Sequence, residues 1–235
     1  MIRAIDRSLD AQAVRLTGIH FAQSSVALSV LAEDGVTLAH CVTRPCGRED
    51  AAGVLADLVA ELGLRGTAAF VTLSRADYDS QYVDLPGVSD AELRDALQWR
   101  VTPPGVLTAD EIVVSGARLT NDREIGAGGA PLVRATVMAR STLERVINAV
   151  IGAGLDLQGI YPRETALINL ARRDLAATGV AMDDAATEPP VMAVFIGPRS
   201  TGITITRGAR LYLSRTVQME VPPERGLQAQ QAELL

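Results

Sequence analysis

The sequence predicts an α/β protein made of two related halves joined by a linker. A pattern of three short apolar strands occurs twice, at 14–43 and at 191–217. Both copies have a polar break after the first strand and a hairpin turn after the second. Between the copies, segments of helical periodicity alternate with strand-like segments, and a stretch at 177–190 containing Asp-Asp and Pro-Pro predicts the linker.

The first half is expected to contain a meander, then a helix and a fourth strand. Asp34-Gly35 is a typical hairpin turn between the second and third strands. Apolar residues recur at i, i+1, i+4, i+5 and i+8 across 49–62, which predicts a helix with one buried stripe, and Gly63 marks its end. The strands of this half are expected at 14–21, 25–31, 36–43 and 67–73.

A strand–helix–strand–strand unit within 76–155 is expected to interrupt the first half. Ser89 and Glu92 form a Ser-x-x-Glu capping box, and so do Ser141 and Glu144. Such a box predicts a helix start because both side chains can satisfy free backbone amides. The elements of the unit are expected as a strand at 78–85, a helix at 89–101 and strands at 111–119 and 132–139.

The helix that follows Ser141 should end at Gly152 and Gly154. Its buried face should consist of Leu143, Val146, Ile147, Val150 and Ile151. The first subdomain is thus expected at 14–75 plus 156–178, the linker at 177–190 and a second domain from 191 to 235. This second domain is expected to be incomplete, because 219–235 is too short to supply the helices that its sheet needs.

Composition excludes several classes of function. All 22 basic residues are arginine, so a Walker A loop and a Schiff-base lysine are impossible. His20, His40, Cys41 and Cys46 lack the spacing of a zinc site, and we expect no metal. The net charge of −6 disfavours nucleic acid. The sequence has no apolar run of membrane-spanning length and no leader-like start, so we expect a cytoplasmic protein.

Three sequences in the middle of the chain carry a family resemblance: LSRADY at 73–78, QYVDLPGV at 81–88 and AELRDALQWR at 91–100. They resemble the MSHA-pilus biogenesis protein MshI and the PilM-like proteins of type IV pilus assembly, which are also similar to the cytoplasmic domain of the type II secretion protein GspL. The match continues at 131–140, 154–170 and 199–201. The resemblance implies an actin-like fold of the ribonuclease H type, carrying the inserted strand–helix–strand–strand subdomain.

The resemblance also implies a role. The protein would be a cytoplasmic scaffold, peripheral to the inner membrane, that binds the cytoplasmic tail of a bitopic PilN- or MshJ-like membrane protein. The implied docking surface lies between 71–81 and the helix at 89–101. Its candidate contact residues are Tyr78, Tyr82, Trp99 and Arg100.

The sequence departs from the nucleotide-binding members of the fold at both phosphate loops. His20 stands about where the metal-side aspartate belongs in the first loop, and Phe195 in the second, where Pro198 also removes a backbone donor. We therefore expect a vestigial nucleotide site, no cofactor and no enzyme activity; the alternative is an ATP-binding assembly ATPase. The remnants of the two loops are His20, Gln23, Ser24, Gly197 and Ser200.

Plainer interpretations stay open for the two most distinctive side chains. His20 can be an ordinary hydrogen-bonded strand residue. Trp99 can be an interface anchor next to Arg100, or it can cover the small core of the inserted unit. An unrelated hydrolase is disfavoured, because Asp77 and Asp79 stand without sugar-stacking aromatic residues and no Gly-x-Ser-x-Gly sequence occurs.

Overall fold

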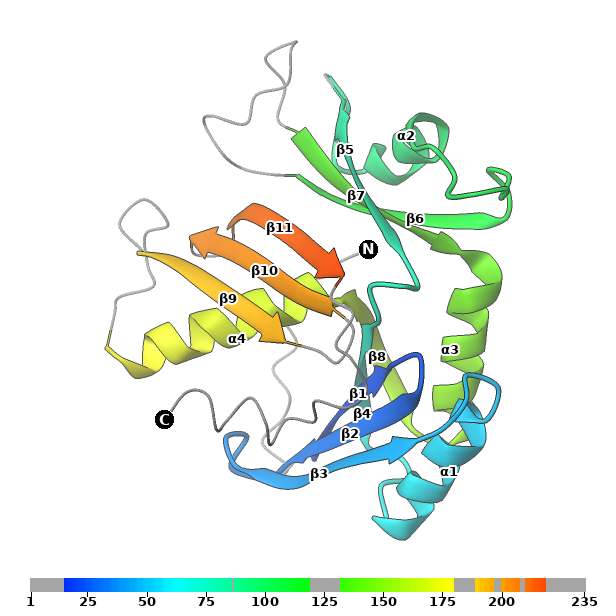
Figure 1. Ribbon diagram of the computed structural model, residues 1–235, viewed down its shortest axis with the longest axis vertical. Helices are drawn as coiled ribbons and strands as arrows, with labels where there is room; N and C mark the ends of the chain where they lie inside the picture. The colour runs from blue at the N-terminus through cyan, green and yellow to red at the C-terminus, as the bar shows by residue number, and fades with distance from the viewer. Residues whose placement is uncertain are drawn as a thin grey trace. The chain divides into compact units, whose positions relative to one another are not determined.

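The computed structural model describes residues 15–85, 87–118, 132–179, 189–196, 200–207 and 210–218. The chain forms two compact units, Met1–Arg163 and Glu164–Leu235. Figure 1 shows the elements of both. Sheets and helices alternate along the chain as in an α/β protein, which confirms the predicted class.

The main sheet of the first unit has five strands in the order β3-β2-β1-β4-β8. β1, β2 and β3 form the predicted antiparallel meander, and β4 and β8 join it in parallel. Parallel neighbours need crossover connections, and helices supply them here. The strands are β1 (Leu16–Phe21), β2 (Ser25–Leu31), β3 (Leu38–Pro45), β4 (Ala68–Leu73) and β8 (Asp156–Pro162).

The third strand begins two residues later than predicted. The Oδ1 atom of Asp34 accepts hydrogen bonds of 2.8 Å from the backbone amides of Val36 and Thr37. The amide of Thr37 is thereby turned towards Asp34, and the strand starts at Leu38. The side chain of Asp34 therefore lengthens the turn at the expense of the strand.

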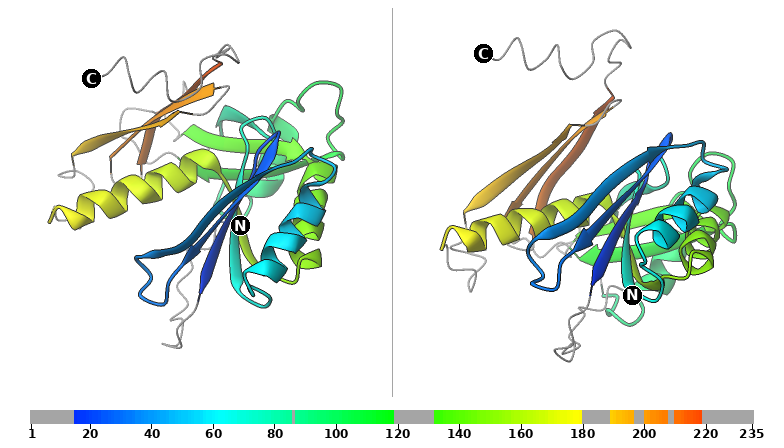
Figure 2. Two further views of the ribbon diagram at one scale, coloured as in Figure 1. Left: turned by 60° about the horizontal axis from the view of Figure 1, so that its bottom comes forward. Right: turned by 90° about the horizontal axis from the view of Figure 1, so that it is seen from below.

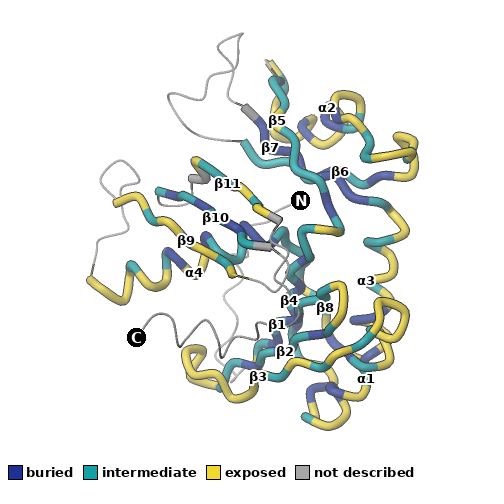
Figure 3. Tube along the Cα trace, viewed as in Figure 1, coloured by how far each residue is buried: buried dark blue, intermediate teal, exposed yellow. Residues whose placement is uncertain are grey.

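One face of this sheet carries the main core. Alternate residues of β1, β2 and β4 are buried and share one core with residues of helices α1 (Ala51–Glu61) and α3 (Arg140–Gly152). Figure 3 marks the buried residues in dark blue. The two helices contact each other. Fully buried members of this core include Val26, Leu28, Val30, Leu55, Leu58, Val59, Leu64 and Val71.

Both helices end in the same hydrogen-bonded motif. After α1, Gly63 has φ +63° and the amide of Leu64 donates to the carbonyl of Val59. After α3, Gly154 has φ +83° and the amide of Leu155 donates to the carbonyl of Val150. These are Schellman motifs, in which glycine accepts a left-handed backbone and the next apolar residue turns into the core. The predicted helix ends at Gly63 and Gly154 are confirmed.

The inserted sheet has the order β5-β7-β6 and is antiparallel throughout. Helix α2 (Leu93–Arg100) packs on one of its faces, where Leu97 and Val133 are both 0% exposed. The strands are β5 (Asp79–Asp84), β6 (Ile112–Arg118) and β7 (Leu132–Ala139). The predicted strand–helix–strand–strand order is confirmed.

The two capping boxes do not form as predicted. Glu92 accepts a hydrogen bond from the amide of Ser89, but the Ser89 hydroxyl donates to the same carboxylate, and α2 starts only at Leu93. Helix α3 starts at Arg140, before the second box, without a side-chain cap. Ile151, predicted to point inward, is 59% exposed because the buried stripe of α3 passes through Val146, Ala149 and Val150 instead.

The second unit contains most of helix α4 (Arg163–Ala177) and the sheet β11-β10-β9. Its strands are β9 (Pro190–Ile196), β10 (Ser200–Arg207) and β11 (Arg210–Gln218). They form the second antiparallel meander that the sequence predicts. Figure 2 shows α4 lying along this sheet. Among the described residues, no helix is long and apolar enough to cross a membrane.

Candidate functional site

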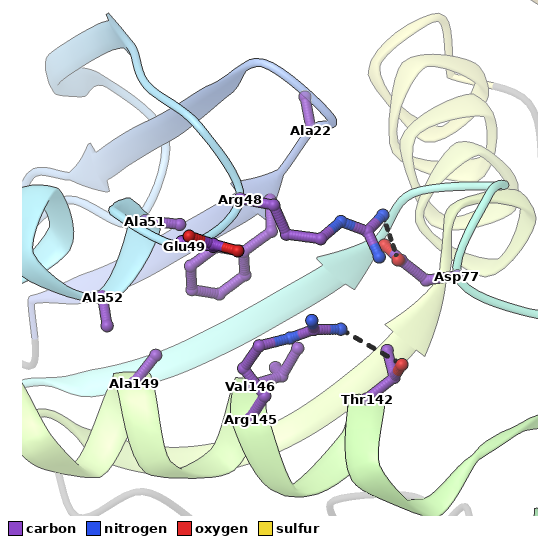
Figure 4. Close-up of a pocket in the computed structure, with 11 residues that line it drawn as sticks. Ala22, Arg48, Glu49, Ala51, Ala52, Asp77, Thr142, Arg145, Val146 and Ala149 are labelled. Atoms are coloured by element: carbon purple, nitrogen blue, oxygen red, sulfur yellow. Dashed lines mark hydrogen bonds and ion pairs between the residues drawn. The ribbon is translucent and has the colours of Figure 1, made fainter.

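A pocket of about 60 Å³ opens on the first unit where four segments meet. The β1–β2 turn supplies Phe21 and Ala22, and the start of α1 supplies Ala51 and Ala52. The loop after β4 and one face of α3 complete the walls (Figure 4). The pocket thus lies beside the loop that leads from the main sheet into the inserted sheet.

The floor of the pocket is apolar. Val146 and Ala149 of α3 are both largely buried and face the small residues Ala51 and Ala52 of α1. Thr142 lies one turn before Val146, so the wall from α3 follows helical spacing. Small side chains on both helices leave a hollow that larger ones would fill.

Charged side chains border this floor. Nη2 of Arg48 lies 2.6 Å from Oδ1 of Asp77, and the Asp77 side chain is only 7% exposed. On α3, Nη2 of Arg145 donates to the hydroxyl of Thr142 at 3.1 Å. Figure 4 shows both guanidinium groups extending along the pocket. The carboxylate of Glu49 also lines the pocket, so two arginines and two carboxylates border the apolar floor. Such a floor suits an apolar side chain whose neighbouring backbone groups can bind the charged rim.

The lining contains no histidine, cysteine or serine, and its carboxylates are those of Glu49 and Asp77. Asp77 is paired with Arg48. In the part of the chain that the structure describes, no group of three His, Cys, Asp or Glu side chains could hold a metal ion.

His20, predicted to replace the metal-side aspartate, is a hydrogen-bonded strand residue. Its Nδ1 lies 3.1 Å from the carbonyl oxygen and 3.1 Å from the hydroxyl oxygen of Thr72, its neighbour on β4. Burial lowers the pKa of His20 below its ordinary value of 6.5, against the hydrogen bond to Thr72, and the charge of Arg163 lowers it further. The imidazole is therefore neutral at pH 7 and differs from a carboxylate in charge.

The other predicted loop residues fall into separate parts of the chain. Gln23 and Ser24 are exposed at the β1–β2 turn, close in sequence to His20. Ser200 is the first residue of β10 in the second unit, and Gly197 lies outside the described residues. The structure thus places His20, Gln23 and Ser24 together on the β1–β2 hairpin.

The predicted contact residues differ in accessibility. Tyr78 is 4% exposed, lies in the main core and carries the Arg75 guanidinium 5.0 Å from its ring centre. Tyr82 on β5 is 52% exposed, and Trp99 on α2 is 84% exposed beside the exposed Arg100. Trp99 therefore does not cover the core of the inserted unit. Tyr82 and Trp99 are accessible at the surface, whereas Tyr78 is buried in the core.

The implied docking surface and the pocket share the segment at 71–81 but use different sides of it. Gln81 ties this segment to the end of α2 through two hydrogen bonds with the backbone of Thr102. Asp77, by contrast, faces α1 and α3. Sequence reasoning missed the side formed by α1 and α3. The spacing of Thr142, Val146 and Ala149 indicates a helix face, but it does not say which helix lies opposite.

The chain is similar in structure to proteins of the actin-like fold. A chain of the PilM–PilN type IV pilus biogenesis complex matches with a TM-score of 0.63 and 19% identity, over 88% of this chain and 62% of that chain. The cytoplasmic domain of EpsL, an inner-membrane component of the Vibrio cholerae type II secretion system, matches with a TM-score of 0.59 and 10% identity, over 87% and 71%. A Bacteroides thetaiotaomicron protein with an actin-like ATPase fold matches with a TM-score of 0.51 and 8% identity, over 89% and 72%.

These likenesses establish the fold. This chain spans less than two thirds of the length of the pilus protein chain that it matches. No family model matches the sequence, and no curated protein matches it either. The predicted actin-like architecture is confirmed, with the strand–helix–strand–strand unit inserted between β4 and β8.

Proposed function

We propose that this protein is a scaffold of a type IV pilus or type II secretion assembly that holds a polypeptide segment of a partner. The observation that carries the proposal is the pocket between α1 and α3, an apolar floor bordered by the charged side chains of Arg48, Arg145 and Glu49. The fold likeness to a chain of the PilM–PilN complex and to the EpsL cytoplasmic domain supports this role by analogy.

The proposed occupant is the cytoplasmic tail of a bitopic inner-membrane protein of the PilN or MshJ kind. One apolar side chain of the tail would rest on Val146 and Ala149. The exposed guanidinium of Arg145 can turn from Thr142 to a carbonyl or carboxylate of the tail. Bound in this way, the protein would be cytoplasmic and held at the inner membrane through its partner.

We further propose that the scaffold works without nucleotide. A neutral His20, whose Nδ1 hydrogen bond goes to Thr72, supplies no negative charge to a magnesium ion. Titration of the purified protein with MgATP in a calorimeter should give no saturable heat. Saturable binding in the micromolar range would favour the alternative, an ATP-binding assembly ATPase of the same machinery.

The docking proposal can be tested by tryptophan substitutions at two alanines of α1, one inside the pocket and one outside it. Fluorescent peptides that copy the cytoplasmic tails of PilN- and MshJ-like proteins from the same genome serve as probes in anisotropy titrations. Ala52→Trp places a large ring at the pocket and should weaken binding about tenfold or more, because the floor is then filled. Ala60→Trp is the matched control, since Ala60 is also exposed on α1 but lies outside the pocket.

Equal binding by both variants would show that the tail docks elsewhere. The surface around Tyr82, Trp99 and Arg100 would then be the next one to test, through Trp99→Ser and Arg100→Glu. A protein that binds none of the tails at concentrations up to about 1 mM would have no biologically useful affinity for them, which would overturn the proposal.

A further inference from the structure

Four charged side chains line the pocket between α1 and α3, and two of them are already paired. Arg48 and Asp77 form an ion pair of 2.6 Å. The other two are Glu49, just before α1, and Arg145 of α3, and both are exposed. The pocket therefore keeps one anionic and one cationic group for a ligand.

Glu49 and Arg145 lack an oppositely charged partner. Throughout the ranges that the structure describes, neither side chain forms an ion pair, and the guanidinium of Arg145 donates to the neutral hydroxyl of Thr142. A hydrogen bond between two ionised groups is stronger than one to a hydroxyl. A ligand that brings a carboxylate to Arg145 therefore gains more than it displaces.

The two groups lie on different walls of the pocket. Glu49 belongs to the segment that enters α1, whereas Arg145 directly precedes Val146 of the apolar floor on α3. Figure 4 shows Glu49 on the side of α1 and Arg145 on the side of α3. A chain that crosses from one helix to the other thus passes an anionic group, an apolar hollow and a cationic group in turn.

We propose that the pocket selects a polypeptide segment in which one apolar residue is flanked by an acidic residue on one side and a basic residue on the other. This charge pattern rests on the proposed function and adds to it the chemistry of the partner's segment. The acidic residue binds Arg145 and the basic residue binds Glu49. The apolar side chain rests on the floor that Val146 and Ala149 form.

The geometry of an extended chain sets the spacing of the three residues. Every second side chain points the same way, so the residues two before and two after the apolar one face the pocket with it, about 13 Å from each other. Packed helices lie about 8–10 Å apart, and the long side chains of Glu49 and Arg145 bridge the difference. The pattern is therefore acidic-x-apolar-x-basic, and the reverse order fits equally because the chain can cross in either direction.

The test uses the whole chain and three synthetic peptides that differ only in two charges. Each peptide of about ten residues has a central leucine. The residues two before and two after it are aspartate and arginine in the mixed peptide, two aspartates in the acidic peptide and two arginines in the basic peptide.

Binding is measured by NMR on protein with carbon-13 in its alanine methyl groups, because Ala51, Ala52 and Ala149 line the pocket. Shifts of these methyl groups report dissociation constants up to about 1 mM. In low salt the wild type should bind the mixed peptide about threefold more tightly, or better, than either other peptide.

Charge reversal in the protein should change the preferred peptide. Glu49→Arg leaves two unpaired arginines at the pocket and should bind the acidic peptide most tightly. Arg145→Glu leaves two unpaired carboxylates and should bind the basic peptide most tightly. In about 0.5 M NaCl all preferences should shrink below about twofold, because salt screens exposed charges.

Matched controls make the same changes of net charge outside the pocket. Arg44 of β3 and Glu61 at the end of α1 form an exposed ion pair, and neither residue lines the pocket. Glu61→Arg and Arg44→Glu should both keep the preference of the wild type for the mixed peptide. Far-ultraviolet circular dichroism checks that all four variants fold.

Three results would overturn the charge pattern. The first is equal binding of the three peptides by the wild type in low salt. The second is a change of preference in the control variants as large as in the pocket variants, which would be an effect of net charge. The third is the absence of any shift at the pocket alanines up to about 1 mM peptide.

Failure of the charge pattern and failure of the proposed function give different results. If the peptides follow the charges of the pocket but no PilN- or MshJ-like tail binds, the charge pattern stands and the proposed partner is wrong. If a tail binds and Ala52→Trp weakens it, while Glu49→Arg and Arg145→Glu leave its affinity unchanged, the proposed function stands and the charge pattern is wrong.

Discussion

Arg48 and Asp77 join two segments that lie far apart in the sequence. Nη2 of Arg48, just before α1, lies 2.6 Å from Oδ1 of Asp77, in the loop between β4 and β5. Arg48 is 40% exposed, whereas Asp77 is almost completely covered. The pair holds the entrance to the inserted sheet against the helix that forms one wall of the pocket.

Removing the charge of Asp77 should destabilise the first unit. Asp77→Asn should lower the free energy of unfolding by about 1–3 kcal/mol, since a neutral amide replaces the carboxylate and Arg48 loses its charge-assisted hydrogen bond. Urea unfolding followed by circular dichroism measures this change. Asp90→Asn is the control, because Asp90 pairs with Arg118 at 2.6 Å but is 86% exposed, and its loss should cost less than about 1 kcal/mol. Equal effects would show that burial of Asp77 adds nothing.

Gly116 allows helix α2 to approach the inserted sheet. A Cβ atom at this position would overlap Cδ1 of Leu97 and lie 3.1 Å from Cγ1 of Val133, and both side chains are fully buried. Gly116→Ala should therefore destabilise the inserted subdomain by about 1–3 kcal/mol, through overpacking. Thermal unfolding is the measurement.

Replacing Gly53 by alanine should have the opposite effect on stability from replacing Gly116. Gly53 lies inside α1, and a Cβ atom there would meet nothing within 4 Å. Gly53→Ala should raise the free energy of unfolding by about 0.5–1 kcal/mol, because alanine loses less backbone entropy in a helix. If Gly116→Ala were also stabilising, α2 would have to lie farther from the sheet than the structure places it.

His20 should make stability depend on pH. Its pKa is lower in the folded protein than the ordinary value of 6.5, mainly because of burial. Below about pH 6.5 the unfolded chain therefore binds a proton more readily than the folded one, so stability falls as the pH falls and is fully present above that value. His20→Gln should make the free energy of unfolding depend less on pH in this range. Above about pH 7, the difference in stability between the two proteins should be constant.

Urea unfolding at intervals between about pH 5 and 8 measures both profiles. The difference between wild type and His20→Gln isolates the histidine from the carboxylates, which titrate lower. The prediction would be wrong if the wild type became more stable relative to the variant as the pH falls. The pKa of His20 would then be raised by folding, and the hydrogen bond to Thr72 would outweigh burial.

Trp99 should be dispensable for folding. With 84% of its surface exposed, Trp99→Ser should change the free energy of unfolding by less than about 0.5 kcal/mol. The tryptophan emission of the wild type should also be that of a solvated indole, and acrylamide should quench it efficiently. Strong protection from quenching in the protein alone would show that Trp99 is covered, for example by a second copy.

Local patterns in the sequence predicted most of the elements. Helix α1 and the strands of both meanders follow from apolar periodicity, and the ends of α1 and α3 follow from Gly63 and Gly154, which alone among neighbouring residues adopt the left-handed backbone without strain. These signals are local, so neighbouring residues suffice to read them. The predictions from the two capping boxes were wrong, because a sequence motif does not show which hydrogen bonds its side chains make in the folded chain. The Ser89 hydroxyl donates to Glu92 and not to a backbone acceptor of the helix, and α3 begins at Arg140, before its expected cap at Ser141.

The candidate sites required the tertiary structure. Nothing near Arg48 in the sequence indicates Asp77, and nothing in the sequence of α3 indicates that Ala51 of α1 lies across from Ala149. Likewise, 191–196 is apolar throughout, so the sequence of β9 does not say which of its residues are covered, and only the register with β10 and β11 shows which side chains share a face. The sequence by itself determined the elements and their order, because propensity and periodicity act between neighbours. The tertiary structure decided which surfaces meet and which stay open, because packing joins residues that the chain keeps far apart.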